Sequence, residues 1–268
     1  MYKGIRKLTE TLAEAVFPSN IYCICCGALI DSTRMYSLCD ECIRKLHWIT
    51  GRACDKCGKA LPDTYHGNIC YDCMQHSHSF VKGFSCLTYG LYEREVLMDY
   101  KYNGKGYIGR KFGDILYDRI SCENIQIDVI IPVPISRERM RKRGYNQSSV
   151  MSQQLALRMN VPFDDKSLVR IKNTHMLRSL DPAEREFALE GAFAVVTGAV
   201  PACLGKKKEK SSTDVSRIYG KRVLLIDDIM TTGATADACS KALLEAGADS
   251  VIFLSLASGG NWKPGQEQ

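Results

Sequence analysis

Four Cys-x-x-Cys pairs near the N-terminus constrain this chain more than any other feature of its sequence. Twelve residues separate the first pair from the second, and twelve separate the third from the fourth. Tetrahedral Zn²⁺ takes four soft ligands at about 2.3 Å, and two such turns on a ribbon bring four sulfurs to one ion. The spacing therefore predicts two structural zinc sites. Their ligands are Cys23, Cys26, Cys39 and Cys42 in the first site and Cys54, Cys57, Cys70 and Cys73 in the second.

Several neighbouring residues bear on this prediction. Gly27 and Gly58 follow the second cysteine of a pair, where a tight turn often needs a positive φ. Cys25 could replace Cys23 or Cys26 as a ligand, although the spacing favours the latter two. A redox pair of the thioredoxin kind, disulfides and buried thiols are the alternatives to zinc. We expect His47, His66, His76 and His78 at the surface or beside the ligands, and Cys86, Cys122, Cys203 and Cys239 to be ordinary thiols.

Composition and charge exclude few functions. The 268 residues are 45% hydrophobic and 25% charged, as in an ordinary globular protein with room for a large and a small domain. The formal charge of +6 suggests polyanionic partners, but eight zinc-bound thiolates would lower it. Two glutamates interrupt the start of the chain, which therefore does not resemble an export signal. No apolar run reaches the roughly 18 residues of a membrane span, so we expect a cytoplasmic protein without a transmembrane segment.

The apolar pattern divides the chain into two expected domains. Residues 4–16 have helical spacing and would form a short amphipathic helix, after which the cysteine pairs dominate. We expect this helix and the double zinc module over 1–80, and a second domain over 81–268. A Lys-rich and Ser-rich run at 201–217 is expected to be an exposed or disordered loop, with a phosphate-binding arm as the alternative.

The second expected domain alternates apolar runs with helical stretches. The runs at 127–133 and 222–226 are typical of buried strands, whereas 143–159 and 234–246 have helical periodicity. Alternation of this kind favours a parallel sheet covered by helices. The predicted fold class is therefore α/β.

The segment from Val223 to Thr235 carries the strongest chemical signal. An apolar strand leads into Asp227 and Asp228, two carboxylates that can accept hydrogen bonds from the vicinal hydroxyls of a ribose. A turn rich in hydroxyls and backbone N–H groups follows at the start of a helix, which suits a monophosphate. No Gly-Lys-Ser/Thr follows, which disfavours ATP hydrolysis, and the competing interpretation is a plain strand-turn-helix connection with Asp and Thr as caps. The turn residues are Thr231, Thr232, Gly233, Ala234 and Thr235.

This segment looks like the phosphoribosyl-pyrophosphate motif of type I phosphoribosyltransferases, and the whole chain resembles the ComF family of competence-associated proteins. The resemblance runs from about residue 15 to residue 257 and depends on motifs in a fixed order. It implies a type I phosphoribosyltransferase-like parallel sheet after a zinc-ribbon-like module, with phosphoribosyl pyrophosphate as the ligand and Mg²⁺ bound to it. The motifs are the cysteine module, Tyr100–Gly104, Val129–Pro134 with Arg137 and Arg139, Arg143–Gln147 and the segment above.

The resemblance also implies roles for a second loop. The turn after Pro134 would bind pyrophosphate, whose departure from ribose C1 leaves negative charge that cations can stabilise. The expected catalytic groups are the acid pair and Arg137, with Arg143 as an alternative cation. A solvated basic helix start is the competing interpretation, and Asn146 and Gln147 would bind substrate or cap a helix. Ligand contacts are expected from Pro134, Ile135, Ser136, Arg137, Arg139 and Lys172.

Residues 170–185 resemble the flexible loop that closes over the site in the amidophosphoribosyltransferase branch. The sequence departs from the ComF pattern here, because Leu177 and Ala188 stand where relatives tend to carry Gln and Asn. The loss of two polar side chains bears on turnover or on the choice of acceptor, and it leaves the ribose-phosphate motif intact. The basic members of the loop would be Lys172, Arg178 and Arg185.

Two functions follow from the resemblance. In the first, the chain binds phosphoribosyl pyrophosphate and handles incoming single-stranded DNA during natural competence, with a competence helicase as partner and with phosphoribosyltransferase activity retained or lost. In the second, it is an active phosphoribosyltransferase or amidophosphoribosyltransferase of nucleotide metabolism. A third interpretation is a zinc-ribbon DNA binder with an inactive transferase domain, whose salt-dependent affinity would lie in residues 20–80.

A short basic and aromatic stretch bears on the DNA hypothesis. Proteins that bind single strands combine a cationic groove with exposed aromatic rings for base stacking. The competing interpretation is a tyrosine-rich edge of the core with solvated lysines. The stretch contains Lys101, Lys105, Arg110 and Lys111 together with Tyr100, Tyr102 and Tyr107.

Overall fold

The structure is a computed structural model that describes four stretches of the chain. The helix expected at 4–16 and residues 201–216 of the expected loop lie outside them. The described residues are 21–102, 106–172, 187–196 and 217–259.

The chain folds as two compact units that divide after residue 46. Met1–Leu46 contains the first cysteine quartet, and His47–Gln268 contains the second quartet together with the sheet. The two quartets therefore belong to different units, although the sequence suggests one module over 1–80. The domain boundary expected at residue 80 stays a prediction.

The first unit is built on two cysteine turns. Gly27 has a φ of 74°, and its N–H donates to the carbonyl of Cys23 at 2.9 Å, which closes the first turn. Cys39 begins the second turn and precedes helix α2 (Asp40–Lys45), whose first turn is acidic and therefore suits the helix dipole. A short 3-10 helix, η1 (Met35–Ser37), lies between the two turns in sequence.

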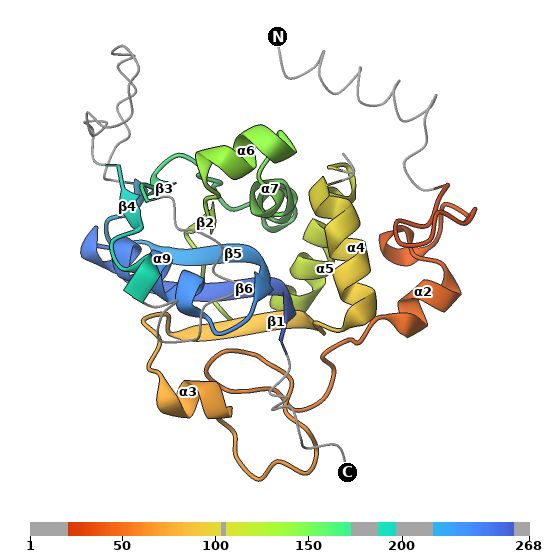
Figure 1. Cartoon of the computed structure of the whole chain (residues 1–268), viewed down its shortest axis with the longest axis horizontal. Helices are drawn as coiled ribbons and strands as arrows, with labels where there is room; N and C mark the ends of the chain where they lie inside the picture. The colour runs from red at the N-terminus through yellow and green to blue at the C-terminus, as the bar shows by residue number, and fades with distance from the viewer. Residues whose placement is uncertain (1–20, 103–105, 173–186, 197–216, 260–268) are drawn as a thin grey trace. The chain divides into compact units, whose positions relative to one another are not determined.

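A four-stranded parallel sheet forms the second unit's centre (Figure 1). Its order, β1-β6-β5-β2, places β5 between two parallel neighbours. Parallel neighbours need long crossover connections, and helices supply them here. The predicted α/β fold class is therefore confirmed. The strands are β1 (Lys82–Thr88), β2 (Val129–Pro132), β5 (Arg222–Met230) and β6 (Ser250–Ser258), while β3 (Leu168–Arg170) and β4 (Phe193–Val195) form a separate antiparallel pair.

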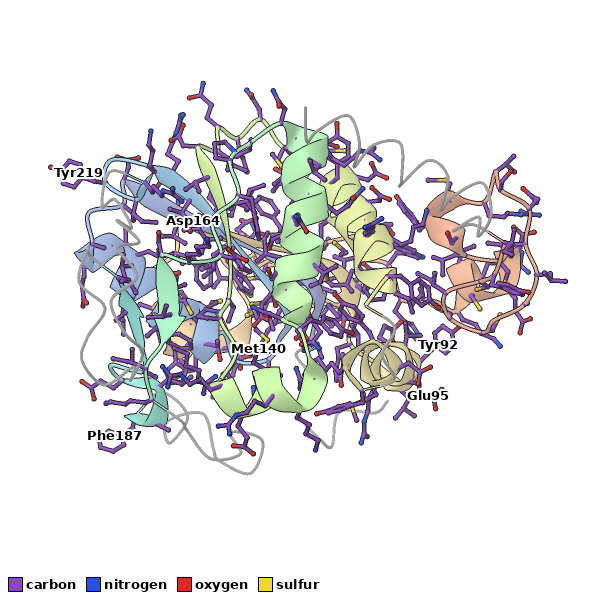
Figure 2. All side chains as sticks on the ribbon, turned by 90° about the horizontal axis from the view of Figure 1, so that it is seen from above. Tyr92, Glu95, Met140, Asp164, Phe187 and Tyr219 are labelled. Atoms are coloured by element: carbon purple, nitrogen blue, oxygen red, sulfur yellow. The ribbon has the colours of Figure 1, made fainter. Side chains whose placement is uncertain are left out.

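Helices cover both faces of the sheet. Helices α5 and α7 pack side by side over one face, which Figure 2 shows from above. Successive strand side chains point to opposite faces, and Val223 and Leu225 lie in one buried cluster with α9 while Leu224 and Ile226 are buried on the opposite face. The helices of this unit that position the site are α3 (Tyr71–Gln75), α4 (Leu91–Tyr102), α5 (Ile108–Ser121), α6 (Arg137–Arg143), α7 (Gln147–Met159) and α9 (Ala234–Glu245).

The second cysteine ribbon is part of the core on the α9 side. Three of its cysteines belong to the same buried cluster as Phe80 and Phe253. A Cβ added to Gly58 would lie 2.5 Å from the Cα of Phe84 in β1, so the ribbon backbone touches the edge strand directly. The three cysteines are Cys54, Cys57 and Cys70.

The observed elements lie close to their predicted bounds, with two informative differences. The run predicted at 222–226 is longer, because β5 continues through both acids to Met230 and pairs with β6 as far as Ser258. The helix predicted over 143–159 begins at Gln147, since Asn146 caps it. None of the described helices combines the length and the apolar character that a membrane span requires.

Candidate functional site

Both predicted cysteine quartets converge in the structure. In each quartet the four Sγ atoms all lie within 4.8 Å of one another. The Sγ atoms of Cys26 and Cys39 are 3.7 Å apart, and those of Cys57 and Cys70 are 3.6 Å apart. A tetrahedron with Zn–S bonds of about 2.3 Å has edges of about 3.8 Å, so the cysteines fit Zn²⁺. The two quartets are therefore structural zinc sites.

The convergence also bears on the competing interpretations of the cysteines. The first set contains Cys23 and Cys26 and leaves out Cys25, as the spacing favours. Four sulfurs meet in each set, whereas a disulfide or redox pair would need two. Of the other cysteines, Cys86 and Cys239 are buried and Cys122 is exposed, while Cys203 lies outside the described residues. The nearby histidines His47, His66 and His76 are exposed, and His78 is half-buried.

The two predicted acids lie at the carboxyl end of β5. The Ser148 Oγ, at the start of α7, donates to Oδ1 of Asp227 at 3.0 Å, and the N–H of Asp228 donates to the same oxygen at 2.8 Å. Asp228 forms an ion pair with Lys101 of α4, with 2.7 Å between Nζ and Oδ2. Because these two side chains are 8% and 13% exposed, the ion pair is shielded from water. The acid pair is thus held by three elements that are distant in sequence.

Asp227 holds its proton unusually well. Burial and the neighbouring charge of Asp228 raise the pKa of Asp227 to about 7, although hydrogen bonds and Lys101 act in the opposite direction. A carboxyl group in this state can donate a hydrogen bond as well as accept one near neutral pH. The site therefore offers one carboxylate paired with a cation and one carboxyl group that titrates near neutrality.

The predicted phosphate turn connects β5 to α9. Gly233 precedes the helix with a φ of 85°, a left-handed backbone that other residues adopt only with strain. The first N–H groups of a helix lack partners within it and can bind an anion. Thr231 is exposed, while Thr232, Ala234 and Thr235 are half-buried. Two residues separate this turn from the acid pair, so both lie at the same edge of the sheet.

The predicted pyrophosphate loop follows β2, the neighbour of β5. Both strands are parallel, so their carboxyl ends meet at one edge, where ligands of open α/β sheets commonly bind. The Ser136 Oγ accepts from the N–H of Arg139 at 3.3 Å and caps α6. Arg137 is exposed, whereas Arg139, Pro134 and Ile135 are half-buried. The loop thus adds cations to the edge that carries the acids.

A further cation lies near these groups. Burial and the neighbouring Arg139 lower the pKa of Arg170 in β3, while the charge of Asp227 acts to raise it. Arg170 is therefore within electrostatic reach of both the acid pair and the pyrophosphate loop. Two residues further on, Lys172 is exposed and donates from Nζ to the carbonyl of Glu190 at 2.7 Å.

Asn146 and Gln147 have structural contacts. The Oδ1 of Asn146 accepts from the N–H of Ser148 at 3.2 Å, and its Nδ2 donates to the carbonyl of Val133 at 3.0 Å, so Asn146 caps α7 and ties it to the end of β2. Gln147 is buried and accepts from Arg143 at 2.9 Å. Arg143 is therefore held by α7 and half-buried.

The basic and aromatic stretch is divided between core and surface. Tyr100 is fully buried, and Lys101 is buried rather than solvated because it pairs with Asp228. Tyr102 and Tyr107 are exposed, at 45% and 63%. Lys105 lies outside the described residues, as do Leu177, Arg178 and Arg185 of the expected closing loop, whereas Ala188 is described and half-buried.

The sequence does not predict the roles of three residues at this site. Lys101 and Ser148 contact the acid pair, and Arg170 is a further cation near it. Lys101 stands in a motif shared with ComF proteins, and Ser148 directly follows another, so adjacency to those motifs was the available signal. Arg170 begins the loop segment that resembles amidophosphoribosyltransferases. In each case the contact joins residues far apart in the chain, which spacing alone does not reveal.

Comparison with known proteins agrees with both parts of the chain. Residues 12–74 match the family described as double zinc ribbon domain. Competence protein F from Haemophilus influenzae is 26% identical over 243 residues, which cover 89% of this chain and 97% of that protein. Competence protein ComFC from Bacillus subtilis is 27% identical over 253 residues, which cover 91% of this chain and 92% of that protein.

Among solved structures, glutamine phosphoribosylpyrophosphate amidotransferase from B. subtilis is similar with a TM-score of 0.35 and 19% identity, over 59% of this chain and 30% of that longer one. The α/β fold is carried by the parallel sheet and by the strand-turn-helix that bears the acids. Sheet, turn and cysteine ribbons together give a parallel α/β fold like that of type I phosphoribosyltransferases, joined to a double zinc ribbon. The chain is ComF-like over about nine-tenths of its length, which confirms the resemblance predicted from its sequence.

Proposed function

We propose that this chain binds phosphoribosyl pyrophosphate with Mg²⁺ and handles incoming single-stranded DNA during natural competence. One observation carries the proposal: the acid pair on β5, the turn before α9 and the basic loop after β2 meet at one edge of the sheet. In that order they suit the ribose, the 5′-phosphate and the pyrophosphate of the ligand.

The acid pair would bind the ribose hydroxyls. Asp228 offers acceptor oxygens in a site shielded from water, and Lys101 balances its charge. Asp227, whose pKa lies near neutrality, can serve a hydroxyl as donor or acceptor. This division of roles explains why two acids stand here, since a single helix cap would need one.

The basic loop would bind the pyrophosphate. Arg137 is exposed at the start of α6, and Arg139 is half-buried in the same turn. Mg²⁺ prefers oxygen ligands and is commonly held by substrate phosphates with one or two carboxylates, which the acid pair can supply. Cations on a departing pyrophosphate would stabilise its developing charge.

Exposed aromatic rings beside cations support the role in DNA handling. The Nζ of Lys142 and the guanidinium carbon of Arg143 lie 5.6 and 5.0 Å from the centroid of the Tyr102 ring. Exposed aromatic rings and nearby cations are the means by which proteins bind single strands without reading sequence. Both competence relatives named above are consistent with this role.

The proposal extends to location and partner. Eight cysteines held as metal ligands suit a reducing compartment, so we place the protein in the cytoplasm. A DNA strand that enters the cell must be drawn in by a motor, and we propose a competence helicase as the partner.

Calorimetric titration with phosphoribosyl pyrophosphate and Mg²⁺ tests the first half of the proposal. We expect wild type to bind and the double substitution Asp227→Asn/Asp228→Asn to weaken binding at least about tenfold, the effect of losing one charged hydrogen bond or more. Asp249→Asn, at the opposite end of the sheet before β6, is the matched control and should bind as wild type does. Absence of binding by wild type would contradict the proposal.

Anisotropy of a labelled oligonucleotide tests the second half. We expect Tyr102→Ala to weaken binding of single-stranded DNA by about 1 to 3 kcal/mol, the usual contribution of one stacked base. Leu157→Ala, at an exposed apolar position on α7, is the control. Equal affinity of the two variants would remove Tyr102 from the DNA surface.

An active phosphoribosyltransferase is the second candidate, because the acids and cations required for leaving-group departure are present. Release of pyrophosphate with ammonia, glutamine or a panel of bases as acceptor distinguishes the two functions. Turnover with one acceptor that disappears in the double Asn variant would establish the enzyme, whereas binding without turnover favours the DNA-handling role.

A further inference from the structure

The segment that leaves the second zinc ribbon, residues 77–80, runs against the phosphate turn. A Cβ added to Gly233 would lie 2.7 Å from Cε1 and 3.2 Å from Nε2 of His78. Real side chains essentially never approach a ring so closely, so the imidazole occupies the space in which a side chain at position 233 would lie. The ring therefore contacts the one residue of the turn that needs a left-handed backbone.

The ring itself is held by the zinc ribbon. His78 stacks on Phe80 with 4.7 Å between the ring centroids and 13° between the planes. Phe80 is fully buried and shares a core cluster with Cys57 and Cys70 of the second zinc site. The position of the imidazole is thus set by the packing that the zinc ribbon makes against the sheet.

A backbone hydrogen bond ties the same segment to α9. The N–H of Ser79 donates to Oδ1 of Asp237 in the first turn of the helix. Asp237 is 8% exposed, forms an ion pair with Lys241 at 3.0 Å, and donates from its own N–H to the carbonyl of Gly233 at 2.8 Å. The turn is therefore connected to the ribbon segment on two sides, by a ring and by a carboxylate.

We propose that His78 is a positioning residue for the phosphate turn, through which the second zinc ribbon holds residues 231–235 in the conformation that binds the 5′-phosphate. This inference rests on the proposed function of the same site and deepens it, because it makes phosphate affinity depend on an element outside the sheet. The imidazole acts here by its shape, as a flat ring packed on Gly233, and its protonation plays no part.

The expected size of the effect follows from the freedom of glycine. Glycine populates more backbone conformations than any other residue, so a turn built on it is ordered by what packs against it. The apparent dissociation constant rises in inverse proportion to the fraction of molecules whose turn is competent to bind. A turn that is competent about one-tenth of the time would bind about tenfold more weakly.

Ribose 5-phosphate and phosphoribosyl pyrophosphate are the probes, titrated calorimetrically into three variants of the full chain. His78→Ala should weaken both ligands by about tenfold, and by the same factor, because both carry the 5′-phosphate. His78→Phe keeps a flat ring and should restore affinity to within about threefold of wild type. His76→Ala, an exposed histidine of the same ribbon, is the matched control and should bind as wild type.

The outcomes separate the alternatives. If His78→Ala binds both ligands as wild type does, the inference is wrong and the proposed function stands. If His78→Phe is as weak as His78→Ala, the imidazole contacts the phosphate directly and the positioning role is wrong. If wild type binds neither ligand, the proposed function fails first.

Asp237→Ala gives an independent measurement should His78→Ala fail to fold. This substitution removes the acceptor of the Ser79 hydrogen bond, which holds the segment carrying His78 against α9 and the turn. We expect weaker binding of ribose 5-phosphate with zinc content of two ions per chain retained, as two quartets require. Unchanged affinity in a folded Asp237→Ala protein would overturn the inference.

Discussion

The two cysteine ribbons share a motif and differ in what surrounds it. Gly27 and Gly58 follow the second cysteine of their pairs with φ values of 74° and 75°, so the two turns have the same local backbone. A Cβ on Gly27 would meet no described atom within 4 Å, whereas a Cβ on Gly58 would lie 2.5 Å from the backbone of Phe84. Cys26 is exposed, while three of the four cysteines in the second quartet are buried.

This difference assigns the two metals to different units. The free energy of binding a structural zinc ion is free energy of folding for the part of the chain that the site organises. The first site lies in the unit Met1–Leu46, and the second is part of the core cluster that contains Phe80 and the first residues of α9. The same sequence motif therefore belongs to the first unit in one case and to the core cluster of the second unit in the other.

Removal of one zinc ligand from each ribbon in turn should produce the largest difference in the stability of the second unit. Structural zinc contributes about 10 to 16 kcal/mol in isolated zinc-finger peptides, so Cys57→Ser should lower the melting temperature of the second unit by at least about 10 °C or prevent folding. Cys26→Ser should leave that temperature unchanged. Trp48 pairs with Leu87 of β1, so its fluorescence during heating reports on the second unit. Equal shifts in the two variants would contradict the comparison.

Alanine at the two glycines tests the surroundings without touching a ligand. Both substitutions place a side chain in the left-handed region, which costs about 1 to 2 kcal/mol. Gly58→Ala must also displace the backbone of Phe84, and overpacking adds about 1 to 3 kcal/mol. We expect urea unfolding of the second unit to be about 3 kcal/mol easier for Gly58→Ala and unchanged for Gly27→Ala. If the unfolding free energy of the second unit is the same for Gly58→Ala as for Gly27→Ala, the second ribbon can move away from β1.

The acid pair should give the second unit a pH dependence of its own. Because the pKa of Asp227 is raised to about 7 in the folded state, the folded protein holds a proton that the unfolded chain has lost above about pH 4. Stability from this group is therefore lost as pH rises through 7. We expect the unfolding free energy of wild type to fall by about 1 kcal/mol more between pH 6 and pH 8 than that of Asp227→Asn. Parallel pH profiles of the two proteins would show that Asp227 is ionised throughout.

The rate of zinc release should distinguish the two ribbons without any substitution in the sheet. Sites whose opening is local lose their metal before those that require unfolding of a core. A chromogenic chelator should therefore remove one zinc ion at least about tenfold faster than the other, and the fast phase should be absent in Cys26→Ser. A single phase that accounts for two ions would show that the ribbons open together.

Much of the fold was predictable because its signals are local. The zinc ligands follow from a spacing of two residues within each pair, and the α9 helix and β5 strand follow from periodicity over a few turns. The residues of the phosphate turn are contiguous, so they could be predicted to lie together without the tertiary structure. Gly233 has the left-handed backbone that such a turn requires.

The contacts that complete the site were not predictable in this way. The sequence places Lys101 either in a basic and aromatic surface or among solvated lysines at the edge of the core, yet its charge lies beside Asp228, 127 positions later in the chain. Ser148 reaches Asp227 because α7 packs over β5. Neither contact can be recognised from the spacing of residues in the sequence, since each depends on how the helices pack on the sheet.

The sequence by itself determined which atoms bind zinc and which ones we propose for ribose and phosphate, because those groups are set by residue type and close spacing. The tertiary structure placed the second ribbon in the core cluster beside the predicted phosphate turn and paired Lys101 with the acids. The physical reason is that burial, and with it the strength of a charge pair or the cost of an added methyl group, depends on neighbours brought together by folding.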